Sequence, residues 1–287
     1  MAKELIKEIN SQMIQNDIQD SKTYIIDNDL HIHTHLSVCS DDVKQTPENI
    51  LQIAKERKLK TICITDHYWD DEVECNTKYN WWYRKQNFEH ISQSLPLPED
   101  KEIRVLFGCE TDVDSSYHVG IPCTRWANFD FIIVSTTHFH HMMGKEWENP
   151  SNRDLANLWV KRFEAVINAD LPFEKVGVAH LASCLIKMDS REAYLQVLDL
   201  IPEKDMRELF LRAANLGVGI ELNYDDIKCK DAEVESVYRM FRIAKECGCK
   251  FYLGSDAHSL TDFKEVDAAF ARAISILGLQ EKDKFIL

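Results

Sequence analysis

The chain has 287 residues, enough for one large domain, and the 45% of them that are hydrophobic can build a substantial core. Its formal net charge of −14 argues against sequence-independent binding to nucleic acid or to anionic lipid. No apolar run approaches the roughly 20 residues that cross a bilayer, and nine cysteines without regular spacing favour free thiols in a reducing cytoplasm.

Residues 1–26 precede the first predicted strand, and we expect them to form a helical extension. Apolar residues recur there at the spacing of one helix face: Leu5, Ile6, Ile9, Met13 and Ile14. The segment lacks the continuous apolar core of a signal peptide, so a short amphipathic helix packed on the domain is the better interpretation.

From residue 29 onward, short apolar runs alternate with amphipathic stretches. The runs have the Ile, Val, Leu, Phe and Cys content of strands buried on both faces, and they span 29–33, 61–65, 104–109, 131–136, 176–179, 218–222 and 251–254. One helix begins at Thr46-Pro47-Glu48, where a cap residue precedes proline, and others are expected near 154–168, 190–200, 203–216, 231–246 and 262–277. The alternation predicts a single α/β domain, residues 1–287, whose parallel strands close into a barrel.

The stretch 68–98 interrupts this alternation as a long loop excursion after the second strand. It combines many charges with a set of aromatic residues: Trp69, Tyr79, Trp81, Trp82, Tyr83 and Phe88. We expect these aromatics to form a small satellite core rather than a lid over the substrate.

Metal-capable side chains stand at the ends of six of the seven predicted strands. They are His31 and His33, Asp66 and His67, Glu110, His138, His180, and Asp256 and His258. The carboxyl ends of the strands in a parallel barrel meet at one mouth, where catalytic residues are placed. The strand period of two puts His31 and His33 on one face, and a carboxylate directly after a buried strand is costly unless it is paired or coordinated. The sequence therefore predicts a shared metal centre.

In this order, these residues resemble the PHP family, named for polymerase and histidinol phosphatase. The similar motifs are Asp29-Leu30-His31-Ile32-His33-Thr34, Thr65-Asp66-His67, Gly108-Cys109-Glu110, the later His138 and His180, and Gly254-Ser255-Asp256-Ala257-His258. The resemblance implies a distorted TIM-like (β/α)7 barrel that holds two or three divalent metal ions and hydrolyses a phosphate ester.

The resemblance also implies how the ligands are shared among the ions. These are His31, His33, Glu110 and Asp256 for a first ion, Glu110, His138 and His180 for a second, and His67 and His258 for a third. Mixed imidazole and carboxylate ligation suits Zn, Mn or Fe, and the sequence does not choose among them.

The third ion should have a further ligand shortly after the first motif, where members of the family usually carry His or Asp. The corresponding segment here is longer than usual. Asp41 is the favoured ligand because of its Ser-Asp context, and Cys39, His35 and Asp42 are the alternatives.

A water between two such ions loses a proton near neutral pH and can attack phosphorus in line. Asp256 would orient that water, and His258 or His67 would protonate the leaving group. Candidate substrate-binding residues are His140, which could equally lie on a solvated loop, Asn223, and the possible phosphate clamps Arg153 and Arg191.

The preferred hypothesis is therefore a metal-dependent phosphoesterase acting on a small-molecule phosphate monoester, in the manner of a histidinol phosphatase. An amidohydrolase-type enzyme that cleaves C–N bonds is an alternative, because those barrels also open with His-x-His, although no strand-end lysine supports it. A metal-bound regulatory module without catalysis is another, against which the near-complete ligand set argues. The sequence favours no oligomeric state and indicates no nucleic-acid or membrane partner.

Overall fold

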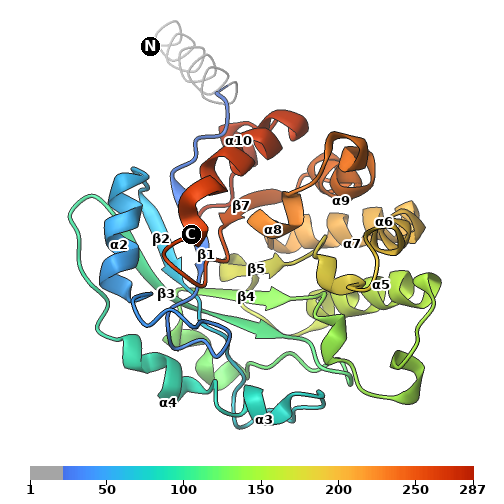
Figure 1. The fold of residues 1–287 in the computed structure, drawn as a ribbon, viewed down its shortest axis with the longest axis horizontal. Coiled ribbons are helices and arrows are strands. Elements are labelled where there is room, and N and C mark those ends of the chain that lie inside the picture. Colours follow the sequence, from blue (N-terminus) through green and yellow to red (C-terminus); the bar gives the residue numbers. More distant parts are fainter. Residues whose placement is uncertain (1–21) are drawn as a thin grey trace, which may run out of the picture.

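The computed structural model describes residues 22–287 (Figure 1). The apolar positions of the expected amphipathic helix, residues 5 to 14, lie outside this range. The described part of the expected extension, residues 22–26, is not helical. Thr23 forms an antiparallel bridge with Gln280, and Tyr24 N donates to Leu279 O at 3.3 Å, so this short piece pairs with the C-terminal segment instead.

Seven parallel strands in the order β1 to β7 form a nearly closed barrel, which confirms the predicted fold class. Their bounds are β1 Asn28–Ile32, β2 Thr61–Ile64, β3 Arg104–Asp112, β4 Phe131–Ser135, β5 Val176–Ala179, β6 Gly219–Asn223 and β7 Lys250–Gly254. Contacts between the first and last strands bring the ends of the sheet together. His33 N donates to Ala257 O at 3.1 Å, and Asp256 N donates to His31 O at 2.7 Å.

The helices lie around the outside of the strands, with α2 beside β1 and β2 and the later helices beside β4 to β7 (Figure 1). Their bounds are α2 Pro47–Glu56, α3 Asn80–Tyr83, α4 Phe88–Ile91, α5 Asn152–Asn168, α6 Arg191–Leu200, α7 Glu203–Leu216, α8 Tyr224–Ile227, α9 Val234–Glu246 and α10 Val266–Leu277. As predicted, Thr46 caps α2 by accepting from Asn49 N, and Pro47 opens the helix. Among the described residues, no helix has both the length and the apolar character needed to span a membrane.

The interior of the barrel has an apolar lower layer, which plugs the end opposite the strand carboxyl ends. Its buried members are Leu30, Cys63, Leu106, Phe131, Ile133, Ala179, Tyr252 and Phe285. At Gly108 there is no room for a side chain, since a Cβ would lie 2.6 Å from Phe131 O and 2.7 Å from Cys63 Sγ. The pairing register of β1 shifts between Asp29 and Ile32. Such an irregularity lets neighbouring Leu30 and His31 reach two different layers of the interior.

The excursion 68–98 contains the short helices α3 and α4. Trp69, Cys75 and Tyr83 are buried together in a small cluster, against which Trp82 packs. Trp69, Tyr83 and Trp82 therefore form the expected satellite core, whereas Tyr79 and Trp81 are exposed and Phe88 packs against the main core. Trp82 also lies beside the histidines, with its ring centroid 5.0 Å from that of His67.

Candidate metal centre

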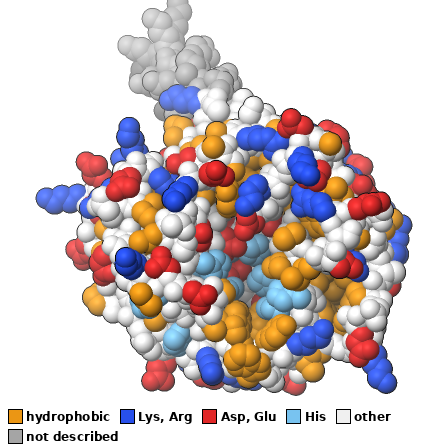
Figure 2. Space-filling model, viewed as in Figure 1, with side chains coloured by type: hydrophobic (Ala, Val, Ile, Leu, Met, Phe, Trp, Pro, Cys, Tyr) orange, Lys and Arg blue, Asp and Glu red, His pale blue; other side chains and the backbone are white. Residues whose placement is uncertain are grey.

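The metal-capable side chains predicted from the sequence meet at the carboxyl ends of the strands. His31 lies in β1 and Glu110 in β3, and the others follow soon after strands: His33, His67, His138, His180, Asp256 and His258. Figure 2 shows histidine side chains gathered on one face of the molecule, next to acidic side chains. Six strands thus deliver donor atoms to one place.

The first group of donors comprises His31, His33, Glu110 and Asp256. The two imidazole Nε2 atoms lie 3.0 Å apart. Glu110 Oε2 lies 3.4 and 3.3 Å from the Nε2 atoms of His31 and His33, and Asp256 Oδ1 lies 3.4 and 3.0 Å from them. Two imidazoles and two carboxylates around a common centre suit a borderline divalent ion.

The second group comprises Glu110, His138 and His180, whose donor atoms all lie within 4.8 Å of one another. His180 Nε2 lies 3.3 Å from Glu110 Oε1 and 3.4 Å from Asp256 Oδ2. Glu110 therefore presents Oε2 to the first group and Oε1 to the second. Its carboxylate stands where a bridging ligand would.

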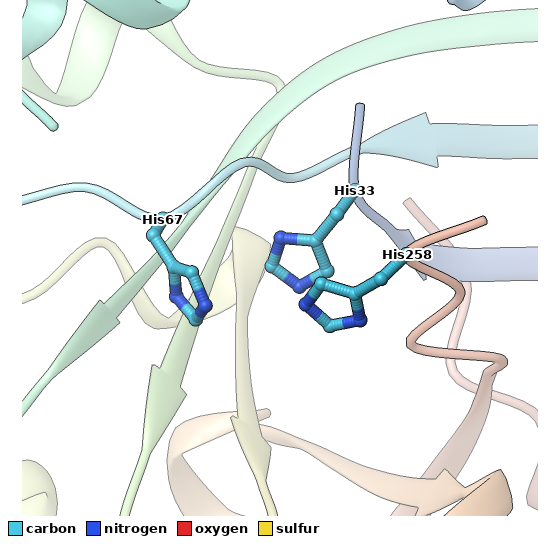
Figure 3. Close-up of side chains that lie close together, drawn as sticks. All are labelled: His33, His67 and His258. Atoms are coloured by element: carbon cyan, nitrogen blue, oxygen red, sulfur yellow. The ribbon is translucent and has the colours of Figure 1, made fainter. Parts of the chain in front are cut away.

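The third group comprises His33, His67 and His258, which come from the loops after β1, β2 and β7. Figure 3 shows their three rings close together. The rings of His33 and His258 are stacked with centroids 4.2 Å apart, and those of His33 and His67 are 4.6 Å apart.

Protein acceptors hold four of these imidazoles at their Nδ1 atoms. The contacts run from His31 to Glu221 Oε1 (2.6 Å), from His33 to Ser37 Oγ (2.8 Å), from His138 to Asp112 Oδ2 (2.9 Å) and from His258 to the Asp256 carbonyl (2.7 Å). Carboxylate and carbonyl oxygens only accept, and Ser37 already donates its own proton to Asp66. Nδ1 therefore carries the proton, and Nε2 presents a lone pair, as in a metal-ligating histidine.

Buried charge at the centre also favours a cation. Burial lowers the pKa of His31, but the carboxylates of Glu221, Asp256 and Glu110 outweigh burial and raise that pKa well above its usual value. Burial would raise the pKa of Glu110, yet the neighbouring His67 and His31 hold it well below the usual range. The carboxylates are thus ionised acceptors that require positive charge beside them.

One buried atom tests whether these residues fit a metal ion. Glu110 Oε2 is inaccessible to water and has no hydrogen-bond partner among residues 22–287, although three imidazoles surround it. An unsatisfied buried carboxylate oxygen is costly, and a divalent ion facing it would remove that cost. The donor set therefore fits a metal centre.

A model of the PHP domain family matches residues 29–225 of the sequence, more than half of the chain. The chain belongs to the PHP domain family. Its similar relatives include a probable phosphatase of Caldicellulosiruptor saccharolyticus, 23% identical over 240 residues that cover 83% of this chain and 84% of the relative. A probable phosphatase of Vibrio vulnificus is 25% identical over 245 residues, covering 84% and 81%. Family and relatives together identify the chain as a hydrolase of the phosphatase class.

Two solved structures share the fold of this PHP chain. The histidinol phosphate phosphatase of Lactococcus lactis, solved with zinc, L-histidinol and phosphate, aligns with a TM-score of 0.57 at 15% identity, covering 91% of this chain and 99% of that one. A putative histidinol phosphatase of Listeria monocytogenes aligns with a TM-score of 0.55 at 14% identity, covering 85% and 99%.

The other predicted site residues have different placements. Asn223 is buried next to the centre, where its Nδ2 lies 3.4 Å from Asp256 Oδ2. His140 is half-buried beside His138, with ring centroids 5.8 Å apart, and burial lowers its pKa to about 3. The side chain of Asp41 is exposed and belongs to none of the donor groups that residues 22–287 form.

The two predicted phosphate clamps, Arg153 and Arg191, contact other residues of the chain. Arg153 donates to the carbonyl of Leu200 at 2.9 Å, and Arg191 pairs with Glu233 at 2.7 Å. Both contacts are at the surface, and nothing in them supports a role in holding phosphate.

Sequence reasoning missed the carboxylates behind the ligands. Glu221 and Asp112 are buried and hold His31 and His138, and Asp226 lies 3.6 Å from His180 Nδ1. The fully buried Arg162 pairs with Asp112 at 2.6 Å and keeps that carboxylate in place. A signal existed for Glu221, because a carboxylate in the middle of a short apolar strand requires a partner.

Two ligands adopt a backbone that non-glycine residues avoid. His180 has φ of 58° and Asp256 has φ of 53°. Each such residue costs about 1–3 kcal/mol, and these conformations gather at functional sites. From these turns after β5 and β7, His180 Nε2 lies 3.3 Å from Glu110 Oε1 and Asp256 Oδ1 lies 3.0 Å from His33 Nε2.

Proposed function

We propose that this PHP chain hydrolyses small-molecule phosphate monoesters at this centre, with two or three divalent ions, Zn, Mn or Fe. The observation that carries the proposal is the convergence of imidazole nitrogens on the carboxylates of Glu110 and Asp256. Glu110 Oε2 has no hydrogen-bond partner within residues 22–287. When bound, the ions supply an activated water and neutralise charge on the phosphate oxygens.

The chain's own residues have distinct roles in this proposal. Asp256 presents Oδ1 to the first group and Oδ2 to the second, so it can accept a hydrogen bond from the attacking water and orient it. His258 is the most exposed member of the three donor groups, with 28% of its side chain exposed, and burial together with His33 lowers its pKa to about 4. It can meet the leaving group, with His67 as the second candidate for that role.

A polar cavity of about 460 Å³ adjoins the centre and is of a size for a small leaving group. Its lining includes Asp256, His258, Tyr224, Lys228 and Lys264. A small, polar and partly charged alcohol matches this lining better than a polymer does. A larger hollow of about 950 Å³ is lined by residues 55–60 and 99–103, and none of these residues belongs to a donor group.

The zinc, L-histidinol and phosphate bound by the Lactococcus lactis enzyme make histidinol phosphate one natural first substrate to test. Sugar phosphates and nucleotides belong in the same panel, because loops select the substrate and one fold serves many substrates.

The test is a phosphate-release screen with the full-length chain, stripped of metal and reloaded with Zn²⁺, Mn²⁺ or Fe²⁺. We expect at least one monoester to be hydrolysed only when metal is present. Glu110→Gln, which removes the bridging charge without changing shape, should abolish release, and circular dichroism should show it still folded. Stoichiometric bound metal without release from any compound would favour C–N hydrolysis or a non-catalytic module.

A further inference from the structure

The loop after β1 returns to the metal centre at Cys39, not at Asp41. Ser37 fixes the loop there, because its Oγ accepts from His67 N at 3.1 Å and donates to Asp66 at 2.7 Å. Two residues later, Cys39 Sγ lies 3.1 Å from His67 Nε2. The next residue, Ser40, holds the loop against the segment after β7, because its Oγ donates to the carbonyl of His258 at 2.6 Å.

Around the third group, atoms that could bind a metal ion have no hydrogen-bond partner among residues 22–287. His258 donates from Nδ1 to a carbonyl and therefore presents the lone pair of Nε2. His67 turns Nδ1 towards Glu110 Oε2, 2.8 Å away, and Nε2 towards Cys39. A thiol proton on Cys39 could satisfy only one of these nitrogens. Glu110 is 1% exposed, and its Oε2, which has no hydrogen bond within the described chain, lies 2.8 Å from His67 Nδ1 and 3.3 Å from His33 Nε2. A cation satisfies all of these atoms together.

We propose that Cys39 binds, as a thiolate, the metal ion held by His67 and His258. This inference rests on the metal binding in the proposed function. On binding, the S–H bond breaks, the sulfur electron pair goes to the ion and the proton leaves to solvent. Sulfur makes this position softer than the first two, whose donors are nitrogen and oxygen only. Zn²⁺ or Co²⁺ is therefore favoured here over Mn²⁺ or Mg²⁺.

Cobalt reports this ligand directly, because thiolate bound to Co²⁺ gives a charge-transfer band in the near ultraviolet that imidazole and carboxylate ligands do not give. The metal-free full-length chain is titrated with Co²⁺, alongside Cys39→Ser and the control Cys123→Ser. Cys123, like Cys39, is an exposed free cysteine outside the three donor groups, but it lies just before β4, at the end of the strands opposite the metal centre. The band should appear in the wild type and in Cys123→Ser and vanish in Cys39→Ser, while the weaker visible bands of cobalt at the other positions remain.

Zinc affinity supplies the second readout. Chelator competition should show the weakest-bound Zn²⁺ about 10–100-fold weaker in Cys39→Ser, on the scale of losing a group that supports a metal site. Cys39→His should restore zinc affinity without restoring the charge-transfer band. A wild type without the band, or a Cys39→Ser variant that keeps it, would overturn the proposal and leave a plain S–H···N hydrogen bond.

A measurement on the wild type alone guards against a variant that misfolds. Zn²⁺ should protect Cys39, but not Cys123, from alkylation by iodoacetamide, as read by peptide mass spectrometry. Neither readout needs catalysis. A cobalt–thiolate band in a protein that releases no phosphate would contradict the phosphoesterase proposal and support Cys39 as a ligand. Phosphate release without the band would support the phosphoesterase and contradict Cys39 as a ligand.

Discussion

The same strands build the lower and upper halves of the barrel interior, and their side chains point inward in both. The lower half is apolar, whereas the upper half is polar and charged. Along β4, Phe131 and Ile133 lie in the apolar layer, and Ser135 donates to Glu110 in the polar one. In β7 Tyr252 belongs to the apolar layer, and Asp256, two residues after the end of that strand, carries charge. A step of two or four residues therefore separates the part of each strand that stabilises the fold from the part that holds the centre.

Glycine residues lie where the two halves meet, at positions that leave no room for a side chain. A Cβ on Gly254 would collide with the carboxylate of Glu221 and lie 2.8 Å from His31 Cβ. A Cβ on Gly177 would lie 2.6 Å from the rings of Phe131 and Tyr252. The apolar layer thus closes from below directly beneath the charged groups, which excludes water from their lower side and strengthens their electrostatic interactions.

The largest effect should come from Asp256→Asn in the upper layer. The amide keeps the shape but loses the charge that faces His31, His33 and His180, so we expect catalytic turnover to fall about 10²–10⁴-fold. Phosphate release at saturating metal measures this, with thermal unfolding as the check on folding. Asp231→Asn, an exposed carboxylate before α9, is the control and should be unchanged. Full activity in Asp256→Asn would contradict its role in orienting water.

Phe131→Ala in the lower layer should reduce stability and leave metal binding unchanged. Phe131 is fully buried and packs on Tyr252 and Phe285, with ring centroids 5.1 and 5.8 Å away. Its truncation should lower the free energy of unfolding by about 3–5 kcal/mol. Urea unfolding of the metal-free protein measures the loss, and metal content of the folded variant should stay at the wild-type value. Lost metal with unchanged stability would show that the two halves are not separate in function.

Glu221→Gln should lower the metal affinity of the centre without abolishing metal binding. Glu221 accepts from His31 Nδ1 at 2.6 Å and from His180 N at 3.2 Å, so it orients one ligand and the backbone of another. Loss of its charge should reduce metal affinity about 10–100-fold, measured by competition with a chelator. Glu233→Gln at the surface is the matched control. Equal affinity in both variants would mean that His31 is held by packing alone.

The sequence could predict the strand ends but not what lies behind them. His31, His33, Glu110 and Asp256 each follow or end an apolar run, so strand periodicity and a parallel barrel are enough to bring them together. Each histidine meets its acceptor through the tertiary fold: Glu221 in β6 reaches His31 in β1 past β7, Asp112 lies on the strand beside the one that His138 follows, and Asp226 lies in α8. No local sequence pattern encodes these pairings.

The choice between Asp41 and Cys39 shows the same limit within a loop. The side chain of Gln45 donates to the carbonyls of His33 and Ala257 at 3.0 and 3.2 Å, so distant residues determine the path of residues 34–45. Sequence context favoured Asp41, while this path brings Cys39 to His67 and leaves Asp41 in solvent.

The smallest effect should be that of Arg191→Gln, which tests the boundary of the upper layer. Arg191 pairs with Glu233 and stacks over the ring of Tyr194 at 4.7 Å, and its side chain is 42% exposed. An exposed pair of this kind is worth about 0–1 kcal/mol, so KM for a phosphorylated substrate should change less than about fivefold. Lys264→Gln, in the cavity beside His258, is the informative comparison and should raise KM more. A larger rise in Arg191→Gln than in Lys264→Gln would place phosphate at α6, outside the barrel mouth, and would move the substrate away from the 460 Å³ cavity.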